Sequence, residues 1–211
     1  MKLLYIYDAL CGWCYGFSPV IEQFVKDKGL ECEVISGGMI TGDRVGPIGE
    51  VAAYISTAYK DVEQRSGVKF GKDFLDGTLA DGSAIFTSLP AAIAMTIFRE
   101  YKPEQQLSFA SDIQKAIYYH GKKPLETQTY VELAEVVGID AKEFEQKMTD
   151  DKYLEKAKQD FAISSQLQVT GFPTVFLLQE NSAAPIARGY ITLEQLENHY
   201  QQALQAFENA G

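Results

Sequence analysis

The sequence predicts an α/β fold in which a long helical segment interrupts a small mixed sheet. Short apolar runs typical of buried strands occur near both ends of the chain, and periodic helical patterns accompany them. The segment 43–150 shows helical patterns and no convincing strand. The outer pieces follow the order β-α-β and then α-β-β-α. We therefore expect one α/β unit from residues 1–42 and 151–211, with 43–150 as an inserted all-helical domain.

The N-terminal piece gives the clearest local signals. Residues 2–7 are apolar and rich in aromatic and branched side chains, which predicts a buried strand. A helix is expected from Cys11 to about Lys28, with a kink at Pro19. Its apolar side chains fall on one stripe, at Phe17, Val20, Ile21, Phe24 and Val25. A second strand is expected at Cys32–Ile35.

The rest of the chain is assigned in the same way. Within the insert, helices are expected at about 47–65, 88–101, 104–120, 129–137 and 141–149, with Ser88 and Asp140 as N-caps. The stretch 67–82 has several glycines and no clear period, so a loop is expected there. After it we expect a helix at 152–167, a strand at 174–179, a turn at 180–182, a short edge strand at 186–188, and a last helix that starts at Thr192 with a capping box to Gln195.

The motif Cys11-Gly12-Trp13-Cys14 lies between the first strand and the first helix. Two thiols three residues apart on one helical turn can close and reopen a disulfide. Unpaired backbone N–H groups and the helix dipole favour the thiolate of the outer cysteine, so Cys11 is the expected nucleophile and Cys14 the resolving thiol. A distant segment, Gly171-Phe172-Pro173-Thr174, precedes another apolar run. Together the two segments predict dithiol–disulfide exchange.

The cysteines and Trp13 also have other interpretations. A zinc site would need two further ligands, and only Cys32, His120 and His199 remain, none at ligand spacing, so no metal is expected. Cys32 is interpreted as a small buried residue, with a regulatory thiol as the alternative. Trp13 either shields the sulfurs and contacts substrate or packs on the insert.

The charge and hydropathy of the sequence limit which binding partners and cellular locations are expected. The net charge of −10 argues against nucleic acid or an anionic membrane surface. No run of about 18 apolar residues could span a bilayer, and no secretory pattern precedes the strand that carries the motif. A cytoplasmic location is therefore expected, where the dithiol is kept reduced and glutathione or thioredoxin supplies electrons.

The segment Asp8-Ala9-Leu10-Cys11-Gly12-Trp13-Cys14, together with Pro19 and Gly171-Phe172-Pro173-Thr174, resembles the DsbA-type thioredoxin-fold family, and most of all its cytoplasmic FrnE-like branch of predicted dithiol–disulfide isomerases. The resemblance implies a thioredoxin fold with a helical domain after the second strand. It also implies a cis Pro173 opposite the cysteines.

The resemblance assigns roles to individual residues as well. Trp13, Phe172, Pro173 and Thr174 are the implied substrate-binding residues, and Gly12 and Trp13, between the cysteines, influence the redox potential. Thioredoxins carry a buried acid six residues before the first cysteine, and here that position is Tyr5. Asp8 is the candidate replacement, with a turn role at the strand end as its alternative.

The expected function is that of a thiol–disulfide oxidoreductase without a bound cofactor, which reduces or isomerises disulfides in proteins or small thiols. One alternative is a glutathione-dependent isomerase or transferase of the lineage related to the kappa class. Another is a non-catalytic thioredoxin-fold binding module. An intact C-x-x-C motif counts against both alternatives.

Overall fold

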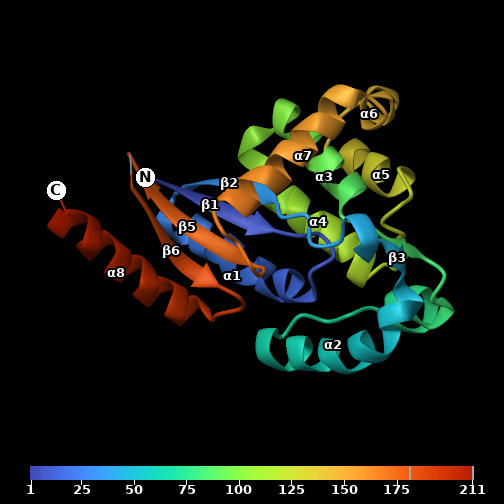
Figure 1. Ribbon diagram of the computed structural model, residues 1–211, viewed down its shortest axis with the longest axis horizontal. Coiled ribbons are helices and arrows are strands. Elements are labelled where there is room, and N and C mark those ends of the chain that lie inside the picture. Colours follow the sequence, from blue (N-terminus) through green and yellow to red (C-terminus); the bar gives the residue numbers. More distant parts are fainter. Residues whose placement is uncertain (181, 211) are drawn as a thin grey trace.

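A computed structural model describes residues 1–180 and 182–210 (Figure 1). Its centre is a four-stranded sheet with the order β2-β1-β5-β6. These strands span Lys2–Tyr7 (β1), Glu31–Ser36 (β2), Thr174–Gln179 (β5) and Ser182–Arg188 (β6). Helix α1, Gly12–Lys28, connects the parallel pair β1 and β2, whereas β5 runs antiparallel to both β1 and β6. This is a thioredoxin fold with a helical insertion, as the sequence predicts.

Strand β1 is buried on both faces. Leu3, Tyr5 and Tyr7 belong to the large core, which also contains residues of α1 and of α8, Leu193–Ala210. Leu4 and Ile6 point the other way and join a smaller apolar cluster. Burial on both faces explains why the strand is a continuous apolar run rather than an alternating one.

Helix α1 begins at the cysteine motif. Cys11 is its N-cap, and Gly29 ends it in the left-handed conformation, with φ of 61°. Gly16, two residues beyond the motif, allows helix α2 (Ala52–Ser66) to pack closely against α1. A Cβ atom there would lie 2.8 Å from a methyl carbon of Val62. The first helix of the insert is therefore held directly against the helix that carries the cysteines.

The helices of the insert lie close to the predicted positions. After α2 come α3 (Leu89–Tyr101), α4 (Gln106–Tyr118), α5 (Gln128–Val136) and α6 (Ala141–Met148). Short 3₁₀ turns at Gly42–Arg44, Ile48–Val51 and Pro103–Gln105 precede some of them. The predicted cap at Asp140 is confirmed, because its carboxylate accepts the Glu143 N–H at 2.8 Å.

Two predictions for the insert were wrong. The expected loop at 67–82 contains a π-helix, Asp73–Leu79. Its wider turn does not give a 3.6-residue period, and burial of Phe74 against Tyr118 holds it in place. The insert also contains a small antiparallel ribbon, β3 (Gly46–Pro47) with β4 (Ile85–Phe86). Strands of two residues are too short to show an alternating pattern.

The C-terminal elements differ only in extent. Strand β6 starts at Ser182, earlier than the predicted Ile186, because it pairs along the whole of β5. Part of the predicted turn, residue 181, lies outside the described residues. The capping box of α8 is confirmed, since the Thr192 N–H donates to Gln195 and the Gln195 N–H donates back to the Thr192 hydroxyl.

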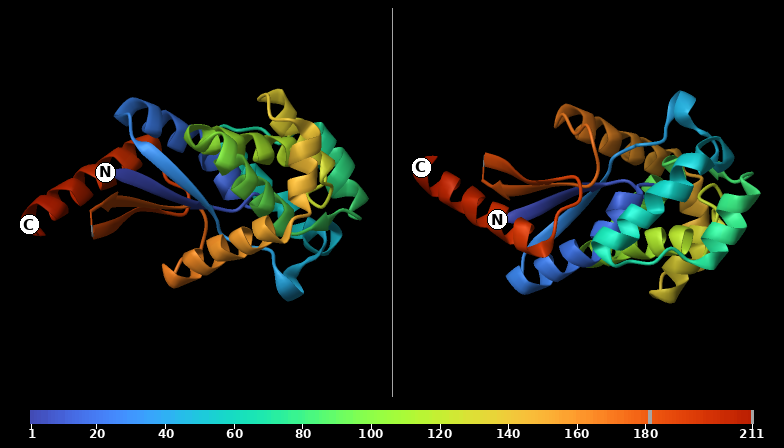
Figure 2. Two further views of the ribbon diagram at one scale, coloured as in Figure 1. Left: turned by 90° about the horizontal axis from the view of Figure 1, so that it is seen from above. Right: turned by 90° about the horizontal axis from the view of Figure 1, so that it is seen from below.

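Helix α7, Asp151–Gln166, leads from the insert back to the sheet and packs on both α3 and β2. The two further views show the helical insert at one end of the sheet and both chain termini at the other (Figure 2). The predicted division at residues 42 and 151 stays a prediction. Of the described helices, none combines the length and apolar character needed to cross a bilayer.

The contact between α3 and α7 includes a cluster of charges around Glu100. Its carboxylate accepts a hydrogen bond from the Tyr153 hydroxyl at 2.6 Å and contacts the ammonium groups of Lys152 and Lys156. Partial burial favours the neutral acid, but these donors outweigh it and lower the pKa of Glu100 to about 2. The charged carboxylate therefore stabilises the packing of α7.

We expect Glu100→Gln to lower the free energy of unfolding by about 1 kcal/mol at neutral pH. The folded pKa lies below the ordinary value of 4.5, so this stabilisation is complete above pH 4.5 and disappears as the pH falls towards 2. Urea unfolding of both proteins across this range measures it. Glu155→Gln, which removes an exposed pair with Lys158 on α7, is the control. A difference that persists at pH 2 would contradict the assignment.

Candidate active site

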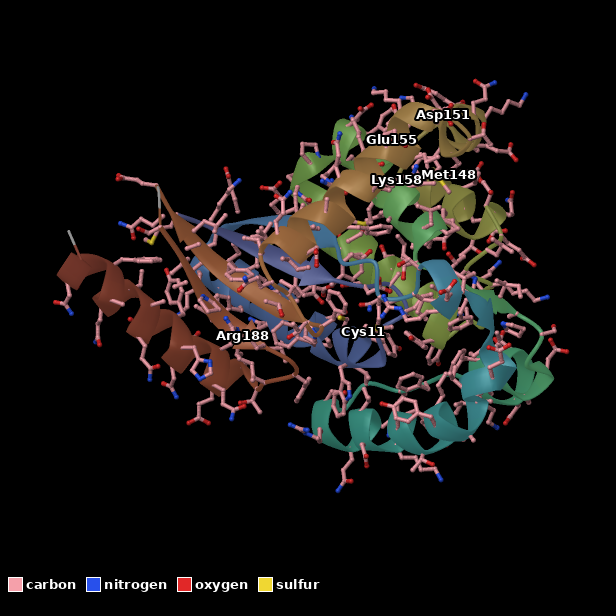
Figure 3. The ribbon with its side chains drawn as sticks, viewed as in Figure 1. Cys11, Met148, Asp151, Glu155, Lys158 and Arg188 are labelled. Atoms are coloured by element: carbon pink, nitrogen blue, oxygen red, sulfur yellow. The ribbon has the colours of Figure 1, made fainter. Side chains whose placement is uncertain are left out.

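The strand register brings the two sequence motifs together. Strand β5 runs antiparallel to β1 with Thr174 opposite Ile6, so the residues before β5 lie beside the residues after β1. The carbonyl oxygen of Phe172 lies 3.6 Å from the sulfur of Cys11, although 161 residues separate them. The Phe172–Pro173 peptide bond is cis, as the resemblance implies. Figure 3 shows Cys11 where the sheet meets the helical insert.

The two cysteines differ in their surroundings. The Cys11 sulfur is placed at the helix N-terminus, where it accepts the Cys14 N–H at 3.2 Å. Cys11 retains 6% of its accessible surface, whereas Cys14 is fully buried. Burial, and then the neighbouring Cys11, raise the pKa of the Cys14 thiol well above its ordinary value. Cys14 therefore stays protonated near neutral pH, and Cys11 is the cysteine placed to react first.

The Phe172 segment is fixed by packing. The ring of Phe172 lies against Gly37, just beyond β2, where an added Cβ would come within 2.0 Å of the ring. This contact holds the Phe172 backbone beside Cys11. Thr174 is buried, and its hydroxyl donates to the Gly171 carbonyl at 2.9 Å, which orders the turn before β5. A role for the Thr174 side chain in binding substrate stays a prediction.

Trp13 is half-buried and connects three parts of the molecule. Its ring centroid lies 5.7 Å from that of Tyr190, which follows β6. The guanidinium carbon of Arg65, on α2, lies 5.1 Å from the Trp13 centroid. Trp13 therefore contacts the insert through Arg65, as one of its two interpretations expects. Its partial exposure next to Cys11 leaves the predicted substrate contact open.

The Asp8 carboxylate connects three segments around the cysteines by hydrogen bonds. This buried carboxylate accepts the N–H groups of Leu10 at 2.9 Å and Met39 at 2.8 Å, and the Ser88 hydroxyl at 3.0 Å. Ser88 is the N-cap residue of α3, as predicted, but its hydroxyl makes no capping hydrogen bond: it donates to Asp8 and accepts the Ile40 N–H at 2.9 Å. Burial raises the pKa of Asp8, and these hydrogen bonds oppose the shift. Asp8 has the predicted turn role, and its negative charge also raises the pKa of Cys14.

Tyr5 occupies the position where related proteins have an acid. Its hydroxyl is buried, without a hydrogen-bond partner among the described residues. Burial raises the pKa of Tyr5 well above its ordinary value, so the phenol stays neutral. Tyr5 therefore cannot accept the Cys14 proton as a carboxylate would, and Asp8 is the carboxylate whose charge acts on Cys14.

Gln114 belongs to this site, and the sequence analysis missed it. It lies on α4 of the insert and is 1% exposed. Its amide nitrogen donates to the carbonyl oxygens of Asp8 at 3.2 Å and Cys11 at 3.4 Å, and its amide oxygen lies 3.0 Å from the Ser18 hydroxyl. A glutamine on a largely apolar helix face was the available signal. It connects the insert to the turn that carries Cys11.

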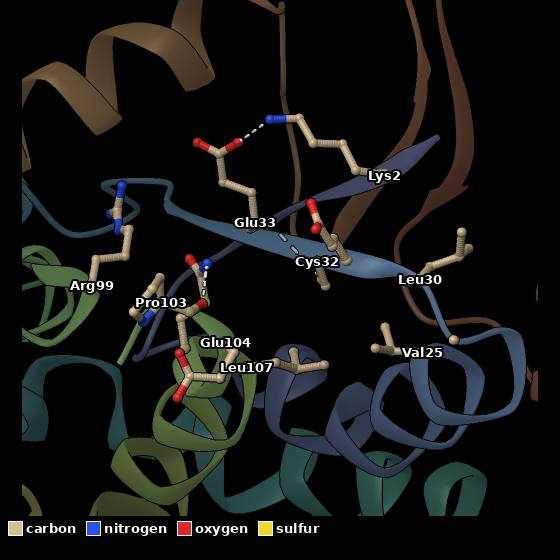
Figure 4. Close-up of a pocket in the computed structure, with 12 residues that line it drawn as sticks. Lys2, Val25, Leu30, Cys32, Glu33, Arg99, Pro103, Glu104 and Leu107 are labelled. Atoms are coloured by element: carbon tan, nitrogen blue, oxygen red, sulfur yellow. Dashed lines mark hydrogen bonds and ion pairs between the residues drawn. The ribbon is translucent and has the colours of Figure 1, made fainter. Parts of the chain in front are cut away.

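The third cysteine lies elsewhere. Cys32 pairs with Leu3 near the start of both strands, whereas Cys11 follows the end of β1. It lines a cavity of about 600 Å³ between β2, α1 and α4, with the Lys2–Glu33 ion pair at its edge (Figure 4). Burial raises the pKa of Cys32 to about 12, which keeps its thiol neutral. Among the residues that the structure describes, no three histidine, cysteine or carboxylate side chains are grouped to bind a metal ion.

A thioredoxin fold that carries C-x-x-C at the start of α1, opposite a cis proline, defines the class of thiol–disulfide oxidoreductases. The sequence matches the DSBA-like thioredoxin domain over residues 3–201, and the chain belongs to this family. Among curated proteins the sequence has no significant match.

Solved structures give a consistent result. Cytosolic disulfide reductase DsbM from Pseudomonas aeruginosa is similar, with 29% identity and a TM-score of 0.81 over 98% of this chain and 100% of that one. A second structure of DsbM contains GSH. A candidate protein disulfide isomerase from Nitrosomonas europaea has 25% identity and a TM-score of 0.85, covering 98% and 99% of the two chains.

These surroundings predict the order of alkylation. At neutral pH, iodoacetamide should modify Cys11 first, while the fully buried thiol of Cys14 and the half-buried, protonated thiol of Cys32 react faster only at higher pH or after unfolding. Peptide mass spectrometry over a pH series measures the three rates. Faster modification of Cys14 would reverse the assigned roles.

Gln114 is predicted to be a positioning residue. Gln114→Leu should slow alkylation of Cys11 on the order of fivefold, because a loosened turn weakens the hydrogen bond from Cys14 N–H to the Cys11 thiolate by about 1 kcal/mol. Gln106→Leu is the matched control. Gln106 is a buried glutamine on the same helix that binds the Val34 N–H and the Pro103 carbonyl, away from the cysteines. Equal effects of the two substitutions on Cys11 reactivity would show a general loss of stability instead.

Proposed function

We propose that this protein reduces or isomerises disulfides through Cys11 and Cys14. The observation that carries the proposal is the asymmetry of the two thiols. Cys11 lies at a helix N-terminus beside the Phe172 carbonyl, while Cys14 is buried and protonated within reach of Cys11. One thiol is placed for attack on a substrate, and the other is held back for the second step.

In the first step the Cys11 thiolate attacks one sulfur of a substrate disulfide. A mixed disulfide with Cys11 forms, and the other substrate sulfur leaves as a thiolate that takes up a proton. In the second step Cys14 gives up its proton and attacks the Cys11 sulfur. The Cys11–Cys14 disulfide forms, and the second substrate sulfur leaves as a thiol. The substrate gains two electrons and the dithiol loses two.

Two thiols of glutathione, or the dithiol of thioredoxin, would restore the reduced state. The structure of DsbM with GSH supports glutathione as a thiol that this architecture can accept. DsbM is described as cytosolic, which supports a reducing compartment for this protein too. In such a compartment a reduced dithiol donates electrons, so reduction or isomerisation is favoured over net oxidation.

The fold alone would also allow the alternative function, that of a glutathione-dependent isomerase or transferase. A 2-hydroxychromene-2-carboxylate isomerase shares the fold at 17% identity with a TM-score of 0.67. The pair Cys11 and Cys14 favours disulfide exchange here, because both cysteines lie in one site, where the backbone N–H of Cys14 donates to the Cys11 sulfur.

We expect Cys14→Ser to trap the substrate as a stable mixed disulfide, because the thiol that resolves it is gone. Cys11→Ser should form no adduct, and Cys32→Ser should behave like the unaltered protein. Non-reducing gels and mass spectrometry of protein isolated after rapid acid quenching measure the adducts. Equilibration in glutathione buffers would give the potential of the Cys11–Cys14 pair, and a value near −120 mV, as in strong oxidants, would contradict the reductase proposal.

A further inference from the structure

We propose that Gly37, and the ring of Phe161 on α7, are positioning residues for the reactive sulfur. They fix the carbonyl group of Phe172, and this carbonyl limits how readily Cys11 forms its thiolate. The proposal rests on the proposed function and concerns the regulation of the same site. It gives α7, a helix outside the cysteine motif, an influence on the first chemical step.

Two backbone groups act on the Cys11 sulfur in opposite directions. The Cys14 N–H donates to the sulfur at 3.2 Å, which favours the thiolate. The Phe172 carbonyl oxygen, 3.6 Å from the sulfur, accepts a hydrogen bond from the thiol but has no hydrogen to offer a thiolate, so it favours the protonated form. The position of this carbonyl therefore affects the balance between thiol and thiolate.

The ring of Phe172 determines where its carbonyl lies. An added Cβ at Gly37 would be 2.0 and 2.3 Å from two carbons of this ring, so the ring occupies the space of the missing side chain. The ring also packs on the smaller apolar cluster of Leu4, Ile6, Ile35 and Phe176. Because packed interiors leave little free volume, a side chain at residue 37 would push the ring and, with it, the backbone that carries the carbonyl.

Helix α7 holds the segment that contains Gly37. The Ser36 N–H donates to the Asp160 carboxylate at 3.3 Å, and Asp160 is only 4% exposed. The next residue on the helix, Phe161, packs its ring on Gly38, where an added Cβ would be 2.8 Å from the ring. The contact between Gly37 and Phe172 is therefore supported on the side away from the cysteines by α7.

The titratable and charged groups around Cys11 stay the same when Gly37 is changed. They are Cys14 on α1, Tyr5 on β1, Asp8 after β1, Tyr118 on α4, and Tyr59 and Arg65 on α2. Burial raises the pKa of the Cys14 thiol and of the Tyr5 and Tyr118 phenols well above their ordinary values, so these three groups stay neutral near neutral pH. A shift in the pH dependence of Cys11 alkylation between variants therefore reports on the backbone around its sulfur.

The rate of Cys11 alkylation by iodoacetamide over a pH series tests the proposal. In Gly37→Ala the carbonyl is displaced, so we expect the midpoint of the profile to move down by about 0.5 pH unit and the rate below the midpoint to rise about threefold. The potential of the Cys11–Cys14 pair in glutathione buffers should become less negative, because a more stable thiolate stabilises the reduced form. An unchanged midpoint with a higher rate at every pH would show only increased exposure, and would overturn the proposal.

Further variants show whether the effect passes through the Phe172 ring and α7. Without that ring, in a Phe172→Ala background, adding Gly37→Ala should not move the midpoint further. An equal shift in both backgrounds would overturn the proposal. Phe161→Leu withdraws the support of Gly38 and should move the midpoint in the same direction by a smaller amount. It also tests the proposal if Gly37→Ala does not fold, and an unchanged midpoint would overturn the role of α7.

Gly138→Ala is the matched control. Gly138 lies between α5 and α6 with φ of 82°, and an added Cβ there meets no atom within 4 Å, so the substitution strains the backbone away from the cysteines. It should lower the temperature of unfolding and leave the midpoint unchanged, and an equal shift would show a loss of stability instead of positioning. Failure of the unaltered protein to reduce glutathione disulfide or peptide disulfides would overturn the proposed function alone, because alkylation needs no disulfide substrate.

Discussion

The antiparallel pairing of β5 with β1 is the interaction on which the site depends. It places the start of β5 beside the end of β1, so the Phe172 carbonyl reaches the Cys11 sulfur. A parallel β5 would put the same residues at the opposite end of the sheet. The long insert between β2 and β5 does not disturb this pairing, because a loop or domain of any length can connect two strand ends that remain in register.

The insert is more than a spacer, since buried polar groups connect it to the cysteine turn. Gln114 binds two carbonyl oxygens of that turn, and Asp8 binds the Ser88 hydroxyl at the start of α3. Buried groups of this kind are costly to leave unpaired, so the two parts of the molecule are coupled more strongly than apolar packing alone would ensure. Gly16 adds close packing of α2 against α1. Movement of the insert would therefore shift the turn that carries Cys11.

The same packing gives the two thiols different surroundings. A helix N-terminus offers hydrogen bonds to the cysteine that caps it, whereas the residue three positions later faces the core. Burial, and then the neighbouring Cys11, keep Cys14 protonated. With Tyr5 in place of a buried acid, no carboxylate at that position helps to deprotonate Cys14.

Most of the architecture followed from the sequence because its signals are local. The buried strand 2–7, the helix that begins after Cys11, the caps at Asp140 and Thr192 and the order of elements all reflect periodicity and end signals within a few residues. Cys11, Cys14 and Pro173 could be identified because their spacing and order are distinctive. The π-helix at Asp73–Leu79 and the ribbon of β3 and β4 could not, since both are stabilised by contacts with distant residues.

The sequence by itself therefore determined the chemistry of the dithiol and the order of the strands and helices that carry it. Only the tertiary structure decided which polar side chains surround it. Ser88 precedes α3 as the sequence predicts, yet its hydroxyl binds the Ile40 N–H and the Asp8 carboxylate, 48 and 80 residues away, instead of an N–H group of the helix. Gln114 resembled any other polar residue on a helix until folding placed it at the Cys11 carbonyl. A hydrogen bond requires proximity in space, and local sequence does not reveal which distant groups folding will bring together.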